Sequence, residues 1–250
     1  IWGSGPEDIH LVGLSGYVAH YDSGGWNITR PEPGMNLEDV FGRGPGEVFA
    51  VGDNGTMIQL EGSTWSYHPP GSRIFFEGVW TGPGCDVYAA GSQGTVLVFD
   101  GDGWETISRS ASGHLYEISG AGKMVYAVGQ GGTIMRYDRT NWDFMSSGTS
   151  RDLYARWGRY GNSMLAAGTE GTVLEYDGTG WRKLTTIANP FLLAIWGADE
   201  SDVWISGALG SLYRYDGHDW NTAYSEGEVW YWGIWGSPES DIYAVGTGGR

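Results

Sequence analysis

Apolar and polar residues alternate in short runs along this chain, and Gly, Asp or Pro interrupts the pattern after each run. Such alternation, rich in Val, Ile, Trp and Tyr, is typical of β-strands. In the stretch 192–224 it predicts four strands, at 192–196, 202–206, 211–215 and 220–224. No segment of useful length carries the period of an amphipathic helix, so we expect an all-β chain.

The same four-strand pattern returns with a spacing of 39 residues, as from Gly168 to Gly207 to Gly246. Its two landmarks are a glycine after the second strand and a tryptophan that opens the fourth. The glycines are Gly13, Gly52, Gly91, Gly129, Gly168, Gly207 and Gly246, and the tryptophans are Trp26, Trp65, Trp104, Trp142, Trp181 and Trp220. A fixed period near 40 residues is the signature of a repeat architecture.

Two turns recur in each repeat. The second and third strands are joined by Gly-x-x-Gly, as in Gly52–Gly55, and glycine supplies the positive φ that a tight hairpin needs. The third and fourth strands are joined by Tyr-Asp-Gly-x-x-Trp, as in 176–181, where the Asp carboxylate can accept hydrogen bonds from backbone N–H groups. We expect the following Trp to pack between neighbouring sheets.

Repeats of four antiparallel strands bury their faces by stacking radially, which predicts a β-propeller over residues 1–250 as a single domain. The first two strands of the repeat occur seven times and the last two occur six times. We therefore favour seven blades with an incomplete or open last blade, and the alternative is six.

The motifs Ala50-Val51-Gly52-Asp53-Asn54-Gly55-Thr56 and Asp177-Gly178-Thr179-Gly180-Trp181 resemble those of bacterial propellers with Asp-box repeats and of the photosystem II assembly-factor propellers. They are also similar to the Trp-Gly…Asp-Val-Tyr-Ala-Val-Gly repeats of large secreted bacterial proteins. The resemblance covers nearly the whole chain and implies the architecture. Sialidase activity is not expected, because Val98 replaces the Asp-box Ser or Thr and Phe75 follows Arg73-Ile74 where a sialidase has Pro.

The chain is strongly acidic, with a formal net charge of −16. Such a charge disfavours nucleic acid and anionic lipid as partners, because long-range repulsion opposes the encounter. No apolar run is long enough to span a membrane, so no membrane insertion is expected. A single cysteine, Cys85, rules out an internal disulfide.

The two ends of the strands carry different residues. One end collects repeated acids, whereas the connections from each fourth strand to the next first strand, which we call the D–A loops, are the least repetitive segments. Binding residues concentrate on variable loops of a rigid scaffold, and Arg and aromatic residues dominate interfaces. The candidate ligand-binding residues on this face are Arg30, His68, Arg73, Arg109, His114, Arg151, Tyr224, Trp230 and Trp232.

Other chemistry is less well supported by the sequence. Glu38, Asp39, Glu77 and Glu117 fall on first strands and could form a carboxylate pair for glycoside hydrolysis. The Asp-rich hairpins offer too few oxygens for calcium, and the five histidines show no zinc spacing. We expect no catalytic residue, no metal and no cofactor.

These observations predict a non-catalytic binding platform, exported to the extracellular space, periplasm or cell surface, that recognises a protein partner or a glycan through the D–A loops. Two alternatives remain open. One is a glycoside hydrolase or lyase that uses the first-strand carboxylates, and the other is an adhesion or spacer module of a larger surface protein.

Overall fold

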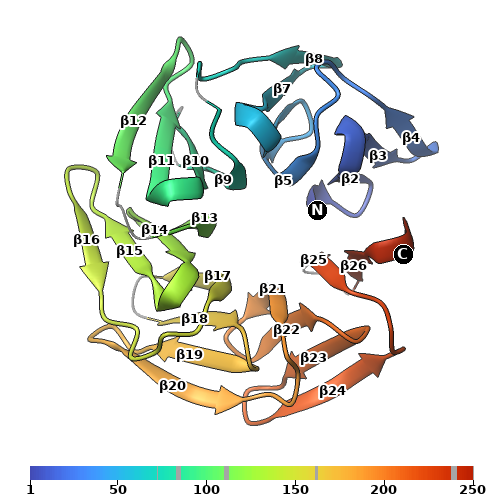
Figure 1. Cartoon of the computed structure of the whole chain (residues 1–250). Coiled ribbons are helices and arrows are strands. Elements are labelled where there is room, and N and C mark those ends of the chain that lie inside the picture. The colour runs from blue at the N-terminus through green and yellow to red at the C-terminus, as the bar shows by residue number, and fades with distance from the viewer. Residues whose placement is uncertain (72, 83–85, 110–112, 161–162, 238–240, 250) are drawn as a thin grey trace. The chain divides into compact units, whose positions relative to one another are not determined.

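The protein is an all-β propeller of four-stranded antiparallel blades, seen here in a computed structural model (Figure 1). The structure describes residues 1–71, 73–82, 86–109, 113–160, 163–237 and 241–249. The only helical segments among them are three-residue 3₁₀ turns. Among these residues, none forms a helix of the length and apolarity needed to cross a membrane. The predicted fold class is confirmed.

The chain divides into two compact units, Ile1–Ile118 and Ser119–Arg250. The first unit holds three complete sheets. Their strands are β1 (Trp2–Gly5), β2 (Asp8–Val12), β3 (Val18–Asp22), β4 (Gly25–Thr29), β5 (Leu37–Gly44), β6 (Glu47–Gly52), β7 (Met57–Glu61), β8 (Thr64–Tyr67), β9 (Phe76–Thr81), β10 (Val87–Gly91), β11 (Thr95–Phe99) and β12 (Trp104–Arg109).

Three further four-stranded sheets follow, and β13 is the strand on which the second unit begins. They comprise β13 (Leu115–Ala121), β14 (Met124–Gly129), β15 (Ile134–Tyr137), β16 (Trp142–Met145), β17 (Leu153–Tyr160), β18 (Ser163–Gly168), β19 (Thr172–Tyr176), β20 (Trp181–Thr186), β21 (Leu192–Asp199), β22 (Asp202–Gly207), β23 (Ser211–Tyr215) and β24 (Trp220–Ser225). The described residues thus form six complete blades, the alternative count. Where the preferred prediction has an incomplete seventh blade, β25 (Tyr231–Gly236) and β26 (Ile242–Gly246) form a two-stranded sheet.

Apolar residues of neighbouring sheets interlock to form the core. Between the second and third blades, Phe49 and Met57 pack with Phe76 and Leu97, all of them almost fully buried. Between the fifth and sixth blades, Val173 packs with Ile205 in the same way. Each sheet therefore buries its faces against its neighbours, as the repeat pattern predicts.

The recurring Trp-Gly pair stacks one blade on the next. The ring of Trp157 in β17 lies on Gly197 of β21, where a Cβ atom would be 2.6 Å from the ring. The Trp157 Nε1 donates to the Gly197 carbonyl oxygen at 3.1 Å. Trp2 lies on Gly42 in the same way, and a Cβ atom at Gly42 would be 2.6 Å from the Trp2 ring. Glycine is required here by close approach, since neither position has a positive φ.

The hairpin between the third and fourth strands is closed by an aspartate and an aromatic pair. Asp177 Oδ1 accepts hydrogen bonds from the backbone N–H groups of Thr179 and Gly180 at 2.9 and 3.1 Å. Beyond the turn, Tyr176 faces Trp181 across the hairpin, with ring centroids 5.4 Å apart. The predicted role of the turn aspartates is confirmed. The packing of the repeated Trp between sheets is also confirmed for Trp104, whose Nε1 donates to the carbonyl oxygen of His68 in the preceding blade.

Candidate functional site

Within the described residues, five of the seven sheets have a β-bulge at the second residue of their first strand. In β21, Leu192 pairs with Gly207 and Ala194 with Ser206, so Leu193 has no partner in the ladder. The same register shift occurs at five blades, and the bulged residues are Glu38, Glu77, Tyr154, Leu193 and Trp232. We call these the bulge positions. Bulges re-aim side chains and are frequent beside functional sites.

Two bulge positions of the second unit belong to a row of aromatic side chains. Tyr154 lies 6.4 Å from Phe191, Phe191 lies 5.1 Å from Trp230, and Trp230 stacks on Trp232 at 5.3 Å between ring centroids. We call these four residues the aromatic row. Trp232 is 56% exposed. The other three side chains are half-buried, so the row presents one exposed indole ring beside partly accessible aromatic surface, which suits an interaction site.

The local backbone fixes the end of this row. Thr247 N donates to the Trp230 carbonyl oxygen at 3.0 Å, and Trp230 N donates to Thr247 Oγ1 at 3.1 Å. The adjacent Tyr231 is buried, whereas the indole rings of Trp230 and Trp232, on either side of it, stack on each other. The bulge at Trp232 and the backbone bonds between Trp230 and Thr247 set where the two rings lie.

Beside the row lies a small acidic loop. Glu226 accepts hydrogen bonds from the hydroxyl groups of Tyr224 and Tyr231, at 3.1 and 2.5 Å. Its backbone N–H donates to the carbonyl oxygen of Gly210. Tyr224 and Leu209 remain about half exposed, at 47% and 50%. This loop adds an apolar and acidic edge to the surface.

The structure thus brings together three of the candidate residues, Tyr224, Trp230 and Trp232, around one loop. Arg151, in the same unit, forms an exposed ion pair with Glu170. That pair is at the surface, so its contribution to stability is small.

The candidates of the first unit have local partners and do not form one cluster. Arg30 donates to the carbonyl oxygens of Ser15 and Gly34 and so holds its own loop. His68 shares a hydrogen bond of 2.9 Å with Ser66 Oγ. Arg73 is exposed, and the side chain of Arg109 lies outside the described residues.

A second feature of the first unit is a pair of neighbouring first-strand carboxylates. Burial, together with the charge of Glu38, raises the pKa of Glu77 to about 7. Burial and the charge of Asp53 likewise raise the pKa of Glu38. His114 Nδ1 lies 3.4 Å from Glu77 Oε1. A carboxyl group with a pKa near neutrality can exchange protons, so this pair keeps the enzyme alternative testable.

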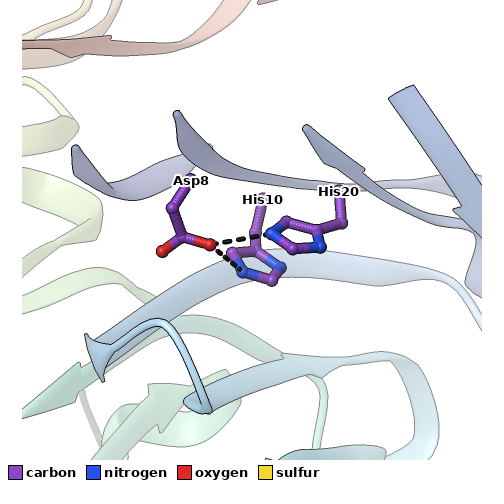
Figure 2. A group of neighbouring side chains, drawn as sticks. All are labelled: Asp8, His10 and His20. Atoms are coloured by element: carbon purple, nitrogen blue, oxygen red, sulfur yellow. Dashed lines mark hydrogen bonds and ion pairs between the residues drawn. The ribbon is translucent and has the colours of Figure 1, made fainter. Parts of the chain in front are cut away.

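Three side chains of metal-ligating type meet in the first blade, and the residue spacing along the sequence does not reveal them. Asp8, His10 and His20 present ligand atoms that all lie within 4.8 Å of one another (Figure 2). The signal was the hairpin register: Asp8 and His10 are two residues apart on β2, and His20 of β3 lies opposite His10. Counting the spacing between histidines along the chain misses a pair that forms across strands.

A groove of about 510 Å³ lies on the outer strands of the second unit, between β20 and the β23–β24 hairpin. Leu184, Tyr213 and Trp220 are among its lining residues. It contains none of the candidate residues.

No family model matches the chain, and no curated protein does. Solved structures do resemble it. The structure "YCF48 bound to D1 peptide" superposes with a TM-score of 0.77 at 18% identity, covering 97% of this chain and 86% of that one. YCF48 from Cyanidioschyzon merolae gives a TM-score of 0.78 at 17% identity and covers 100% of this chain and 92% of that one.

The WD40 β-propeller domain of Doa1 is also similar, with a TM-score of 0.70, 14% identity, and 84% and 75% of the two chains covered. The fold is that of a β-propeller. The YCF48 likeness agrees with the resemblance to photosystem II assembly-factor propellers. The Asp-box likeness and a bacterial origin stay predictions.

Proposed function

We propose that this chain is a non-catalytic binding platform that holds a segment of a partner protein on the aromatic row. The observation that carries the proposal is the stack of the exposed Trp232 on the half-buried Trp230 at the start of the β25–β26 strand pair. Trp side chains bury a large area when they are covered, and Trp is enriched among the residues that dominate binding energy. The Trp232 ring is already stacked on Trp230, so little side-chain ordering is needed on binding.

The comparisons agree with this proposal. A propeller with a TM-score of 0.77 to this chain was solved with a D1 peptide bound. At 18% identity the similarity shows the fold alone. The partner of this chain is therefore inferred from the residues on its own surface.

That surface favours a partner segment with one apolar side chain and neutral or positive charge. Glu226 and Glu228 are exposed beside the aromatic row, and the whole chain carries a net charge of −16. An acidic segment would be repelled, whereas a Lys or Arg beside an aromatic or aliphatic residue would gain both a charge partner and a stacking surface.

Selection of peptides from a displayed random library tests the proposal. We expect enriched peptides to bind the purified chain, and Trp232→Ala and Trp230→Ala to weaken that binding about 10- to 100-fold, as for a central interface aromatic. Trp26→Ala is the matched control, because Trp26 is a 49% exposed tryptophan on the outer strand β4. Equal losses in all three variants, or no loss in the first two, would contradict the site.

A glycan is the competing ligand, since exposed Trp and Tyr rings can stack on sugars. A glycan array run with the same variants separates the two. Saturable binding to a sugar that Trp232→Ala abolishes, together with an empty peptide selection, would make the surface a lectin site.

The pair Glu38 and Glu77 is the observation that favours the second candidate, a carbohydrate-active enzyme. Turnover of aryl glycosides that Glu77→Gln abolishes would support it, because that variant keeps the shape and removes the titrating proton. We expect no turnover. Export and a role as a spacer in a larger surface protein stay proposals, which localisation of the intact gene product would test.

A further inference from the structure

We infer that Asp8, His10 and His20 form a binding site for a divalent transition-metal ion of the zinc class. The inference concerns the first unit and is independent of the proposed peptide surface. It starts from topology. Residues two apart on a strand share a face, and directly opposed residues on adjacent strands share it too. The β2–β3 hairpin therefore places all three ligating side chains on one face of one sheet.

The ligand atoms already converge. Asp8 Oδ1 lies 2.7 Å from His20 Nε2 and 3.3 Å from His10 Nε2, and the two imidazole rings stack in parallel at 4.2 Å (Figure 2). Around a tetrahedral zinc ion with bonds of roughly 2.0–2.2 Å, neighbouring ligand atoms are about 3.3–3.5 Å apart. To admit the ion, the Asp8–His20 hydrogen bond would have to open by about 0.6–0.8 Å, and the stacked imidazole rings would have to turn so that both nitrogen lone pairs point at the ion.

His10 is the side chain that most needs a partner. It is only 1% exposed, its Nδ1 has no hydrogen-bond partner within the described residues, and its Nε2 has only the 3.3 Å contact with Asp8 Oδ1. The rings of Trp2 and Trp65, at 6.1 and 6.5 Å, form part of its surroundings. An imidazole nitrogen buried without a hydrogen bond is unfavourable. A metal bond at Nε2 would satisfy the nitrogen that faces Asp8.

The other two ligands are held ready and accessible. Ser4 Oγ donates to Asp8 Oδ2 at 2.5 Å, which leaves Oδ1 turned toward the histidines. The side chain of His20 is 35% exposed, so an ion and a completing water molecule can enter from that side. Two imidazoles and one carboxylate suit Zn²⁺, Co²⁺, Ni²⁺ or Cu²⁺, whereas Ca²⁺ and Mg²⁺ prefer oxygen ligands.

Calorimetric titration of the untagged, EDTA-treated chain with ZnCl₂ tests the inference. We expect one ion per chain. His20→Ala and Asp8→Asn should lower the affinity at least about 100-fold, because losing a direct ligand costs more than the 10- to 100-fold typical of outer-shell partners. Ser4→Ala, which removes only a positioning hydrogen bond, should lower it about 10-fold. His218→Ala, at an exposed histidine of the second unit, should bind as the wild type does.

Thermal unfolding of every variant in EDTA checks that the fold is retained, and Asp8→Asn is included because it preserves shape. Zn²⁺ should raise the melting temperature of the wild type and of His218→Ala most, that of Ser4→Ala less, and those of His20→Ala and Asp8→Asn least. If the wild type takes up no stoichiometric zinc, or if His20→Ala and Asp8→Asn bind zinc as tightly as the wild type, the site does not exist.

Discussion

At the scale of single residues, most of the glycines that mark the repeats are required by a neighbouring carbonyl oxygen and not by their backbone angle, as at Gly52, Gly91, Gly168, Gly207 and Gly246. Gly52 and Gly168 have no positive φ, yet a Cβ there would lie 2.0 and 1.8 Å from the carbonyl oxygens of Asn36 and Asp152. Each of these oxygens accepts a hydrogen bond from the residue after the glycine. The close approach joins the end of the second strand to the start of the first.

Gly42 provides a test of such packing, because it lies under Trp2 and Gly44 of the same strand lies under nothing. A Cβ at Gly42 would be 2.6 Å from the indole ring, whereas none of the neighbouring atoms lies within 4 Å at Gly44. We expect Gly42→Ala to lower the free energy of unfolding by about 1–3 kcal/mol, the usual cost of overpacking. Urea titration measures it. Gly44→Ala is the control, and equal destabilisation by both variants would refute the packing argument.

At the scale of elements, the stability that the turn aspartates give to their hairpins depends on pH. Hydrogen bonds from the backbone N–H groups of Asp102 and Gly103 lower the pKa of Asp100 below its ordinary value of 3.8. The Thr179 hydroxyl, followed by the backbone N–H groups of Thr179 and Gly180, lowers the pKa of Asp177 to about 2. A group whose pKa is lower in the folded state stabilises the fold above its unfolded pKa. That stabilisation is lost as pH falls through the folded value.

Asp100→Ala should therefore lower the melting temperature at neutral pH and reduce the loss of stability between about pH 4 and pH 2. The control is Asp102→Ala in the same turn, since no hydrogen bond to the Asp102 carboxylate is found among the described residues. Melting curves across this pH range give both quantities. An unchanged acid profile in Asp100→Ala would show that the cap contributes nothing.

The sequence repeat predicted the strand boundaries closely. It did not predict which side chains meet across paired strands. The strand predicted at 211–215 coincides with β23, and that at 202–206 ends one residue before β22 does. Gly and Asp mark the turns so regularly that the boundaries follow from local chemistry. The pairing of His10 with His20 and the bulge at Trp232 depend on register, which a repeat length does not specify. The sequence therefore suggested Trp232 but missed the histidine cluster.

At the scale of the whole molecule, the net charge of −16 governs encounters with any partner. The association rate with a basic partner segment should be high in dilute salt and should fall as added salt screens the attraction. Between about 0.05 and 0.5 M NaCl we expect the association rate to fall at least about tenfold and the dissociation rate to change little. Stopped-flow kinetics with a selected peptide measure this dependence. An association rate that does not change with NaCl concentration would exclude a charged partner segment.

The bulge positions have a consequence for protein engineering. The ladder hydrogen bonds skip Glu38, Glu77, Tyr154, Leu193 and Trp232, so their identities are not set by strand pairing. The glycines and tryptophans that join the blades lie elsewhere in the repeat. Glu38 and Trp232 are exposed members of this set. Substituting them would therefore change what the scaffold recognises and leave in place the residues that determine the fold.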